Sequence, residues 1–133
     1  MKCKDVMKTD VWACHESTTV SRCAQSMRDH NVGFLPVLDD TNRVAGVVTD
    51  RDIAIQIVAE DRPLTTPVSV IMSRDLLTCR PADALGAAEK AMSEAQKSRI
   101  LVIHEDGSCA GVISLSDIGR TENRWRAGQV FQA

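Results

Sequence analysis

The sequence is poor in aromatic residues and has no excess of basic charge. Among its 133 residues, the aromatic ones are Trp12, Phe34, Trp125 and Phe131, so the core must consist mainly of aliphatic side chains and methionine. The formal net charge is −2 and the pI is about 5.9. Nucleic-acid-binding proteins usually carry a basic surplus, so we expect no nucleic-acid partner.

Long apolar runs are also lacking. No run approaches the roughly 20 residues that are needed to span a bilayer. Residues 1–5 lack the apolar stretch of a signal peptide. We therefore expect no membrane partner and a cytoplasmic location.

The cysteines do not form a recognisable framework. There are five of them, and no two have the C-x-x-C spacing: Cys3, Cys14, Cys23, Cys79 and Cys109. An odd number without close pairs argues against the disulfide scaffold of a secreted domain. The sequence Cys14-His15 fits no zinc signature, so no metal site is expected. Redox sensing through a thiol stays open, because reactivity depends on exposure.

The chain repeats itself. Shifting the sequence by 65 residues places residues 6–54 over 71–119 without a gap. Val6-Met7 then matches Ile71-Met72, and the segment 45–53 matches 110–118. One register holds through every element, which indicates a tandem duplication.

Each copy predicts the same succession of elements. A short opening segment leads to an apolar strand, a helix, two strands joined by a polar turn, and a closing helix. The short turns predict antiparallel hairpins. Thr18 and Asp83 are expected to cap the first helix of each copy, and the closing helices begin near Asp50 and Leu115. The expected strands are 11–14, 34–38 and 44–48, then 76–79, 100–103 and 109–113.

The repeats define the expected domains. The first copy covers 1–62, the second covers 63–121, and residues 122–133 form a tail that contains Trp125 and Phe131. A half of about 60 residues buries only ~60% of its unfolded surface and is marginal alone. We therefore expect one α/β (α+β) module in which two β-α-β-β-α repeats pack with pseudo-twofold symmetry.

These motifs carry a resemblance to a known family. Each copy closes on Gly-apolar-apolar-Thr/Ser-x-x-Asp-Ile, and the first copy also contains Gly33-Phe34-Leu35-Pro36-Val37. The pattern is similar to tandem CBS domains, which are named after cystathionine β-synthase, and it extends over residues 2–121. The resemblance implies a CBS pair with two clefts that bind AMP, ADP, ATP or S-adenosylmethionine. No cofactor is required, since the nucleotide is a regulatory ligand.

The resemblance also implies the residues of each cleft. In the first, Thr49 and Asp52 are polar anchors, and Arg51 is a phosphate partner. A carboxylate such as Asp52 can accept both vicinal ribose hydroxyls. The wall of the first cleft is formed by Val11, Trp12, Phe34, Leu35 and Pro36. The second cleft uses Ser114 and Asp117, with Leu76, Leu77, Arg99 and Ile100 around them.

The second copy departs from this pattern. Leu101 replaces Pro36, and Ser116 replaces Arg51. Arg99 could restore a phosphate contact there. These changes favour the first cleft as the better site.

A simpler interpretation competes with ligand binding. Thr49-x-x-Asp52 and Ser114-x-x-Asp117 both satisfy the pattern of a capping box, and the two roles can coexist. Instead of contacting a ligand, Trp12 could equally occupy a position in the core or at an interface.

The expected function is that of a regulatory ligand-sensing module. It would bind an adenine nucleotide, form a homodimer and signal to an unknown effector protein in trans. The alternative is a ligand-free interaction protein or a thiol-redox-responsive protein on the same scaffold. Neither a catalytic triad nor a phosphate-cradling glycine loop is present, so we expect no enzyme.

Overall fold

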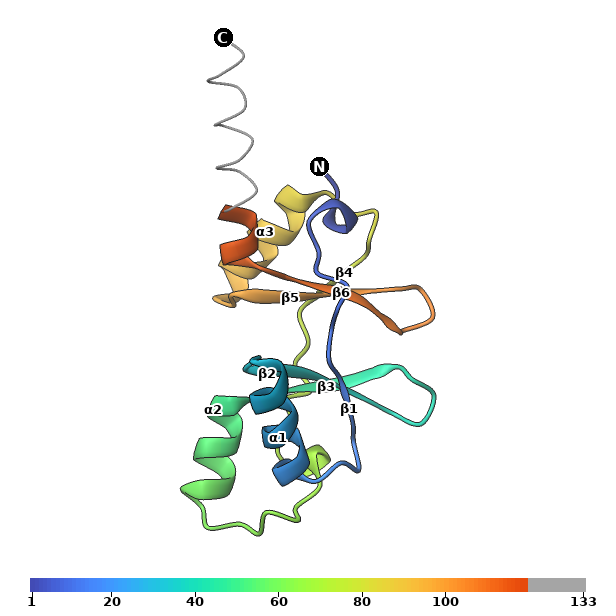
Figure 1. Cartoon of the computed structure of the whole chain (residues 1–133). Helices are drawn as coiled ribbons and strands as arrows, with labels where there is room; N and C mark the ends of the chain where they lie inside the picture. The colour runs from blue at the N-terminus through green and yellow to red at the C-terminus, as the bar shows by residue number, and fades with distance from the viewer. Residues whose placement is uncertain (120–133) are drawn as a thin grey trace. The chain divides into compact units, whose positions relative to one another are not determined.

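The computed structural model describes residues 1–119, and these form two compact units (Figure 1). The first unit contains Val11–Leu76 and Asp106–Cys109, and the second contains Met1–Asp10, Leu77–Glu105 and the chain from Ala110. The expected tail at 122–133, with Trp125 and Phe131, lies outside the described residues.

The first unit is built on a three-stranded sheet. Its strands are β1 (Cys14–His15), β2 (Phe34–Leu38) and β3 (Val44–Thr49), in the order β1-β2-β3. β1 runs parallel to β2, and β3 runs antiparallel to it. The expected hairpin of the first copy is therefore confirmed.

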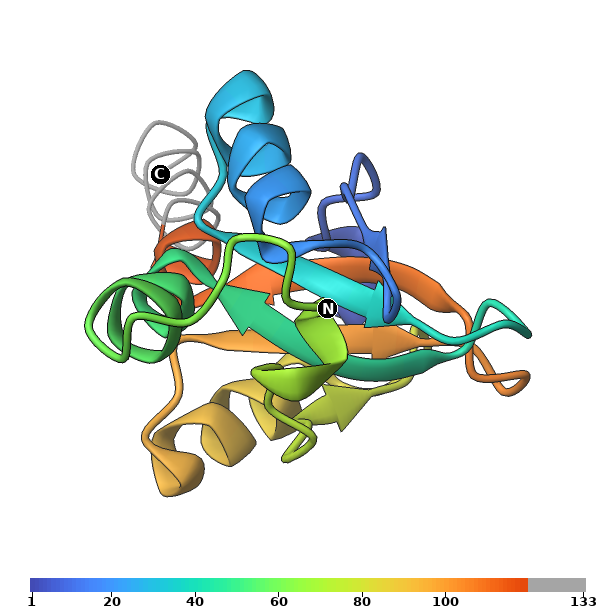
Figure 2. The same ribbon diagram turned by 90° about the horizontal axis from the view of Figure 1, so that it is seen from below.

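Two helical segments cover one face of this first sheet (Figures 1 and 2). Helix α1 (Val20–His30) presents buried Val20, Cys23 and Met27 at helical spacing. Helix α2 (Asp50–Ile53) continues into a π-helical turn at Ala54–Val58. Apolar side chains thus line the side of each helix that faces the sheet.

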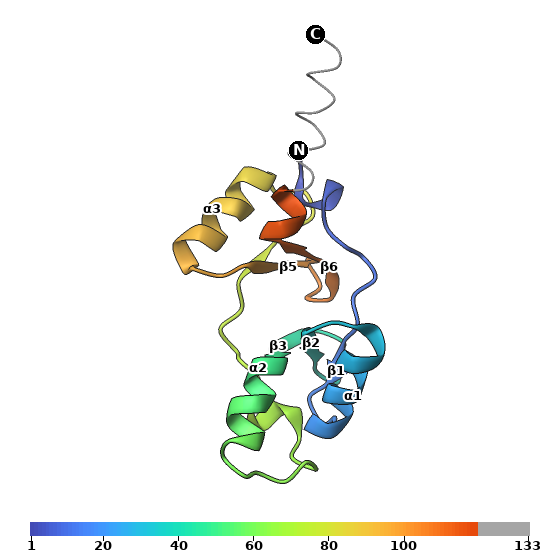
Figure 3. The ribbon, with the colours of Figure 1, turned by 60° about the vertical axis from the view of Figure 1, so that its left-hand side comes forward.

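The second unit repeats this plan. Strands β4 (Thr78–Cys79), β5 (Arg99–Ile103) and β6 (Cys109–Ser114) form a sheet in the order β4-β5-β6. Helix α3 (Leu85–Ala95) and the helical residues 115–119 lie on the same face of that sheet (Figure 3). The mixed α/β fold class is therefore confirmed.

Two local predictions were wrong. The strands expected at 11–14 and 76–79 contain only two residues each, because β1 and β4 pair with their neighbours at two positions apiece. The helix caps come one residue later than expected, at Thr19 and Ala84. Thr18 instead accepts a hydrogen bond from the His15 N–H, at 3.1 Å.

The same correction holds in the second copy. Asp83 accepts a hydrogen bond from the Arg80 N–H at 2.9 Å, as Thr18 does in the first copy. Side-chain oxygens of this kind satisfy backbone N–H groups in turns as well as at helix ends. Both residues therefore close the turn after the first short strand, and neither caps the helix.

The opening segments are exchanged between the two sequence repeats. Cys3 lies in the hydrophobic cluster of the second repeat, whereas Val68, Ile71 and Met72 lie in the cluster of the first. Short 3-10 helices at Cys3–Asp5 and Val68–Val70 begin these segments. Each repeat therefore completes its core with the opening segment of the other.

Each unit has its own hydrophobic core. Leu35, Val37 and Val48 of the first sheet are fully buried, as are Val102 and Ile113 of the second.

Within residues 1–119, no helix is long and apolar enough to cross a bilayer.

Candidate functional site

Each repeat ends its hairpin in a capping box. The Thr49 hydroxyl accepts from the Asp52 N–H at 3.1 Å, and the Asp52 Oδ2 accepts from the Thr49 N–H at 2.9 Å. Ser114 and Asp117 make the same two contacts, at 3.1 and 3.3 Å. These hydrogen bonds satisfy N–H groups that the start of a helix leaves free. The capping role is therefore real in both copies.

In each capping box, one carboxylate oxygen takes no part in capping, and its partners differ between the two copies. Oδ1 of Asp117 is paired with the Lys8 Nζ at 3.4 Å, and the Asp117 side chain is only 9% exposed. Asp52 is half-buried, and its Oδ1 has no hydrogen-bond or ion-pair partner within residues 1–119. Asp52 can therefore cap the helix and still accept hydrogen bonds from a ligand.

Two further residues of the first predicted set lie beside Thr49 and Asp52. Phe34 is half-buried and lies opposite Thr49 in the β2–β3 pairing. Arg51 is exposed on the first turn of α2. The structure thus brings together an aromatic ring, a hydroxyl and a carboxylate, with a guanidinium on the adjoining helix.

The predicted wall residues of the first set divide into two groups. Leu35 and Pro36 are fully buried in the core, so their side chains are engaged there. Val11 is half-buried, and Trp12 is 47% exposed. The Trp12 ring stacks on the His30 ring, with the centroids 3.6 Å apart. Trp12 is thus neither a core residue nor unpartnered.

The second set is more dispersed. Arg99 is exposed at the start of β5, and Ile100 beside it is buried in the core. Leu77 is half-buried, and its carbonyl accepts from the Leu101 N–H at 3.1 Å. Leu76 is half-buried and belongs to the first unit. Within the second unit, Ser114 and Asp117 are the polar pair that the structure holds together.

Two residues near these motifs were missed by the sequence reasoning. Lys8 pairs with Val112 of β6, and Ser73 pairs with Val47 of β3, each through two backbone hydrogen bonds. Lys8 and Ser73 occupy equivalent positions in the duplication, 65 residues apart. The repeat itself shows their equivalence, but the exchange of opening segments is needed to bring them to the sites.

The thiols form two contacting pairs. The Cys79 thiol donates to the Cys3 Sγ at 3.6 Å. Burial and this hydrogen bond raise the pKa of Cys79 to about 12. In the first unit, a hydrogen bond between Cys14 and Cys23 raises the pKa of Cys14 and lowers the pKa of Cys23. All five cysteines are free thiols.

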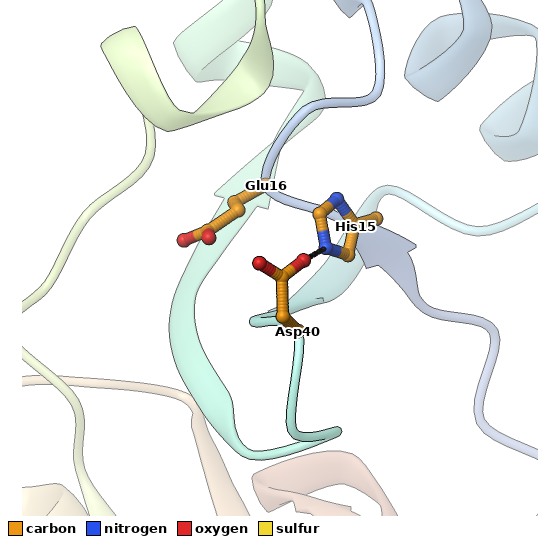
Figure 4. Close-up of side chains that lie close together, drawn as sticks. All are labelled: His15, Glu16 and Asp40. Atoms are coloured by element: carbon orange, nitrogen blue, oxygen red, sulfur yellow. Dashed lines mark hydrogen bonds and ion pairs between the residues drawn. The ribbon is translucent and has the colours of Figure 1, made fainter.

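The first unit also holds a histidine near two carboxylates, with Asp40 lying between His15 and Glu16 (Figure 4). His15, Glu16 and Asp40 place potential ligand atoms within 4.8 Å of one another. The Ser17 N–H donates to His15 Nδ1 at 3.0 Å, and His15 Nε2 lies 2.7 Å from Asp40 Oδ1. In the structure His15 and Asp40 are joined by a hydrogen bond, and Nδ1 also lies 2.7 Å from the Ser17 hydroxyl.

A cavity of about 380 Å³ opens on the first unit near β1 and α1. None of the predicted ligand residues lines it. Its lining contains Cys14 and Cys23 together with Arg22, Ser26 and Asn42.

Comparison with known sequences identifies the repeat. The sequence model of the CBS domain matches residues 3–59 and again 68–121. The CBS domain-containing protein YhcV of Bacillus subtilis is 34% identical over 115 residues, which cover 86% of this chain and 81% of YhcV. Hypoxic response protein 1 of Mycobacterium tuberculosis is 33% identical over 118 residues, covering 88% of this chain and 82% of that protein.

One relative is an enzyme, and only a small part of it is similar. Homoserine O-acetyltransferase of Methanohalophilus mahii is 32% identical over 114 residues, but these are 23% of its length. The similarity is therefore confined to one region of that enzyme.

Solved structures share the fold. A structure of hypoxic response protein I with two coordinated zinc ions has a TM-score of 0.80 at 29% identity, covering 90% of this chain and 98% of that one. The CBS domain pair of MJ0100 with 5-methylthioadenosine and S-adenosyl-L-methionine has a TM-score of 0.81 at 22% identity and covers 92% and 96%. PAE2072 of Pyrobaculum aerophilum, complexed with AMP, has a TM-score of 0.79 at 23% identity and covers 88% and 89%. The two repeats, their paired capping boxes and these similarities lead to one conclusion: the chain belongs to the CBS domain family.

Proposed function

We propose that this protein is a regulatory module that binds an adenine nucleotide or S-adenosylmethionine and signals to a partner protein in trans. The observation that carries the proposal is the Asp52 carboxylate. One of its oxygens caps α2, and the other has no partner within residues 1–119. A ribose hydroxyl is a suitable donor for that oxygen, because hydrogen bonds to an ionised acceptor are the stronger kind.

The surroundings of Asp52 suit the rest of such a ligand. The half-buried Phe34 ring offers an apolar face to a base, and the exposed Arg51 offers a cation to a phosphate. Fold relatives in complex with AMP or S-adenosyl-L-methionine support this class of ligand.

The test is thermal unfolding with AMP, ADP, ATP, S-adenosylmethionine and NAD. A ligand at about 100 times its Kd stabilises the folded state by roughly 2.7 kcal/mol, which raises Tm by several degrees. We expect Asp52→Asn to remove the part of this shift that the first site contributes, because the amide oxygen can still cap α2 but the negative charge is lost.

The matched control separates capping from binding. Asp52→Ala removes the cap acceptor as well, so it should also lower the ligand-free stability, by about 1 kcal/mol. An undiminished Tm shift in Asp52→Asn would contradict the role of the carboxylate. No shift with any of the five compounds would contradict the proposed function.

A specific contact favours a second candidate function, a response to thiol oxidation. The sulfur atoms of Cys3 and Cys79 are 3.6 Å apart, in contact but not bonded. Cys3 is fully buried and Cys79 is half-buried, so Cys79 is the thiol that an oxidant reaches first.

Oxidised glutathione would supply the oxidising equivalents. The Cys79 thiolate attacks the disulfide of oxidised glutathione and releases one glutathione thiolate. Cys3 then attacks the Cys79 sulfur and releases the second glutathione thiolate. Two protein thiols are oxidised, one disulfide is reduced, and the two thiol protons end on glutathione.

We expect the Cys3–Cys79 disulfide to form slowly at pH 7 and faster as the pH rises toward 12. The raised pKa of Cys79 keeps this thiol protonated at neutral pH, and only the thiolate attacks. Peptide mass mapping after timed quenching measures the rate. Cys79→Ser should abolish the linkage, whereas Cys109→Ser should leave it intact. A rate that does not depend on pH, or no linked peptide at any pH, would contradict this candidate.

A further inference from the structure

The two candidate sites receive different side chains at one matched backbone position. The Lys8 N–H donates to the Val112 carbonyl at 2.9 Å, and the Val112 N–H donates back at 3.0 Å. Ser73 makes the same pair of bonds with Val47, at 2.8 and 2.9 Å. The backbones are thus placed alike, and the side chain at this position is the variable part.

Glycines fix this placement. A Cβ on Gly111 would lie 2.6 Å from the Lys8 carbonyl oxygen, and one on Gly46 would lie 2.8 Å from the Ser73 carbonyl oxygen. Real Cβ contacts are essentially never that short, so the opening segment can approach β6 and β3 only because both positions are glycine.

Lys8 changes the charge beside Asp117. Its ammonium lies 3.4 Å from Oδ1, and its side chain is 57% exposed. Within residues 1–119, no lysine or arginine amine lies within ion-pair distance of Asp52. The second repeat also has Ser116 where the first has Arg51. Besides Arg99 at the start of β5, the second site therefore receives a cation from the opening segment, whereas the first site has Arg51 on its own helix.

We infer that Lys8 determines the ligand class of the second site by favouring adenosine that carries a phosphate. The inference rests on the proposed function. A lysine ammonium on a flexible stem can move from a carboxylate to a nearby phosphate. Lys8 also offsets the charge of Asp117, which would otherwise attract the cationic sulfonium of S-adenosylmethionine. The second site should thus prefer AMP to adenosine and to S-adenosylmethionine.

The experiment measures Kd values by calorimetry in a chain whose first site is silenced by Asp52→Asn. In this parent we expect AMP to bind more tightly than adenosine. Lys8→Ser should lower the AMP-to-adenosine affinity ratio about tenfold. Because the ratio compares two ligands on the same protein, a general loss of stability cancels.

Two variants control the measurement. Lys4→Ser removes an exposed lysine from the same segment and should leave the ratio unchanged. In a chain whose second site is silenced by Asp117→Asn, the reciprocal change Ser73→Lys should raise the AMP-to-S-adenosylmethionine ratio of the first site about tenfold.

The outcomes distinguish a failure of this inference from a failure of the proposed function. If Lys8→Ser bound AMP and adenosine with the same affinity ratio as the parent, this inference would be overturned and the proposed function would stand. A ratio that falls equally in Lys4→Ser would also overturn it, because the effect would then be one of overall charge. If the parent bound no adenine compound, the proposed function of the second site would fail and the inference with it.

Discussion

Leu35→Ala is expected to lower the free energy of unfolding by about 2–5 kcal/mol. Leu35 has no exposed surface and belongs to the cluster that joins α1, β2 and β3. Removing its methyl groups loses burial and leaves a cavity that the surrounding side chains cannot fully close. A loss of this size is a large part of the 5–15 kcal/mol typical of a whole domain. Urea denaturation followed by circular dichroism measures it.

Two variants serve as controls for Leu35→Ala. One changes an exposed residue, and the other changes the buried residue at the equivalent position of the second repeat. Ile55 is 46% exposed, so Ile55→Ala should change stability by no more than about 0.5 kcal/mol. Ile100 is 1% exposed at the position equivalent to Leu35, and Ile100→Ala should cost as much as Leu35→Ala. Equal losses for Leu35→Ala and Ile55→Ala would contradict the assignment of Leu35 to the core.

Gly111→Ala is expected to destabilise the protein by about 1–3 kcal/mol, because the added methyl group overfills a close contact. Its Cβ would lie 2.6 Å from the Lys8 carbonyl oxygen and 2.9 Å from the Met7 Sδ. The methionine side chain can move, but the carbonyl belongs to a backbone that is hydrogen-bonded to Val112. The opening segment must therefore shift away from β6.

Substitution of a second glycine is expected to change the free energy of unfolding in the opposite direction. Gly86 lies in the first turn of α3, and a Cβ there would meet nothing within 4 Å. Gly86→Ala should stabilise the protein by about 0.4–1 kcal/mol, since alanine restricts the unfolded chain and favours helix. Denaturant midpoints of both variants test the pair. A Gly111→Ala protein as stable as the parent would show that the opening segment does not need this close approach.

The elements with strong local signals could be predicted from the sequence. β2 was predicted at its observed bounds, Phe34–Leu38, because a short apolar run is followed by a polar turn. The Thr49–Asp52 and Ser114–Asp117 capping boxes were also predicted, since they depend on contacts only three residues apart. The family follows from these same local motifs because they occur twice.

The remaining features depend on long-range contacts. Val11 and Leu76 belong to apolar runs, but extended backbone becomes a strand only where a neighbour pairs with it, and β1 and β4 pair at two positions each. Thr18 was predicted as a cap because threonine suits both caps and turns. Lys8 had no local signal at all: its neighbours Val112 and Asp117 are far away in sequence, and the topology alone brings them together.

The exchange of opening segments also constrains the order in which the chain can fold. Cys3 lies against Ala84, 81 residues further along, and Lys8 bonds to Val112 near the end of the described chain. During synthesis, residues 1–10 must therefore wait until Val112 has left the ribosome. Contacts of such long range slow folding, because the loop must close before the contacts can stabilise it. A gene fragment that ends after the first repeat would leave this segment without its partner strand, so the two repeats are expected to be inherited and expressed together.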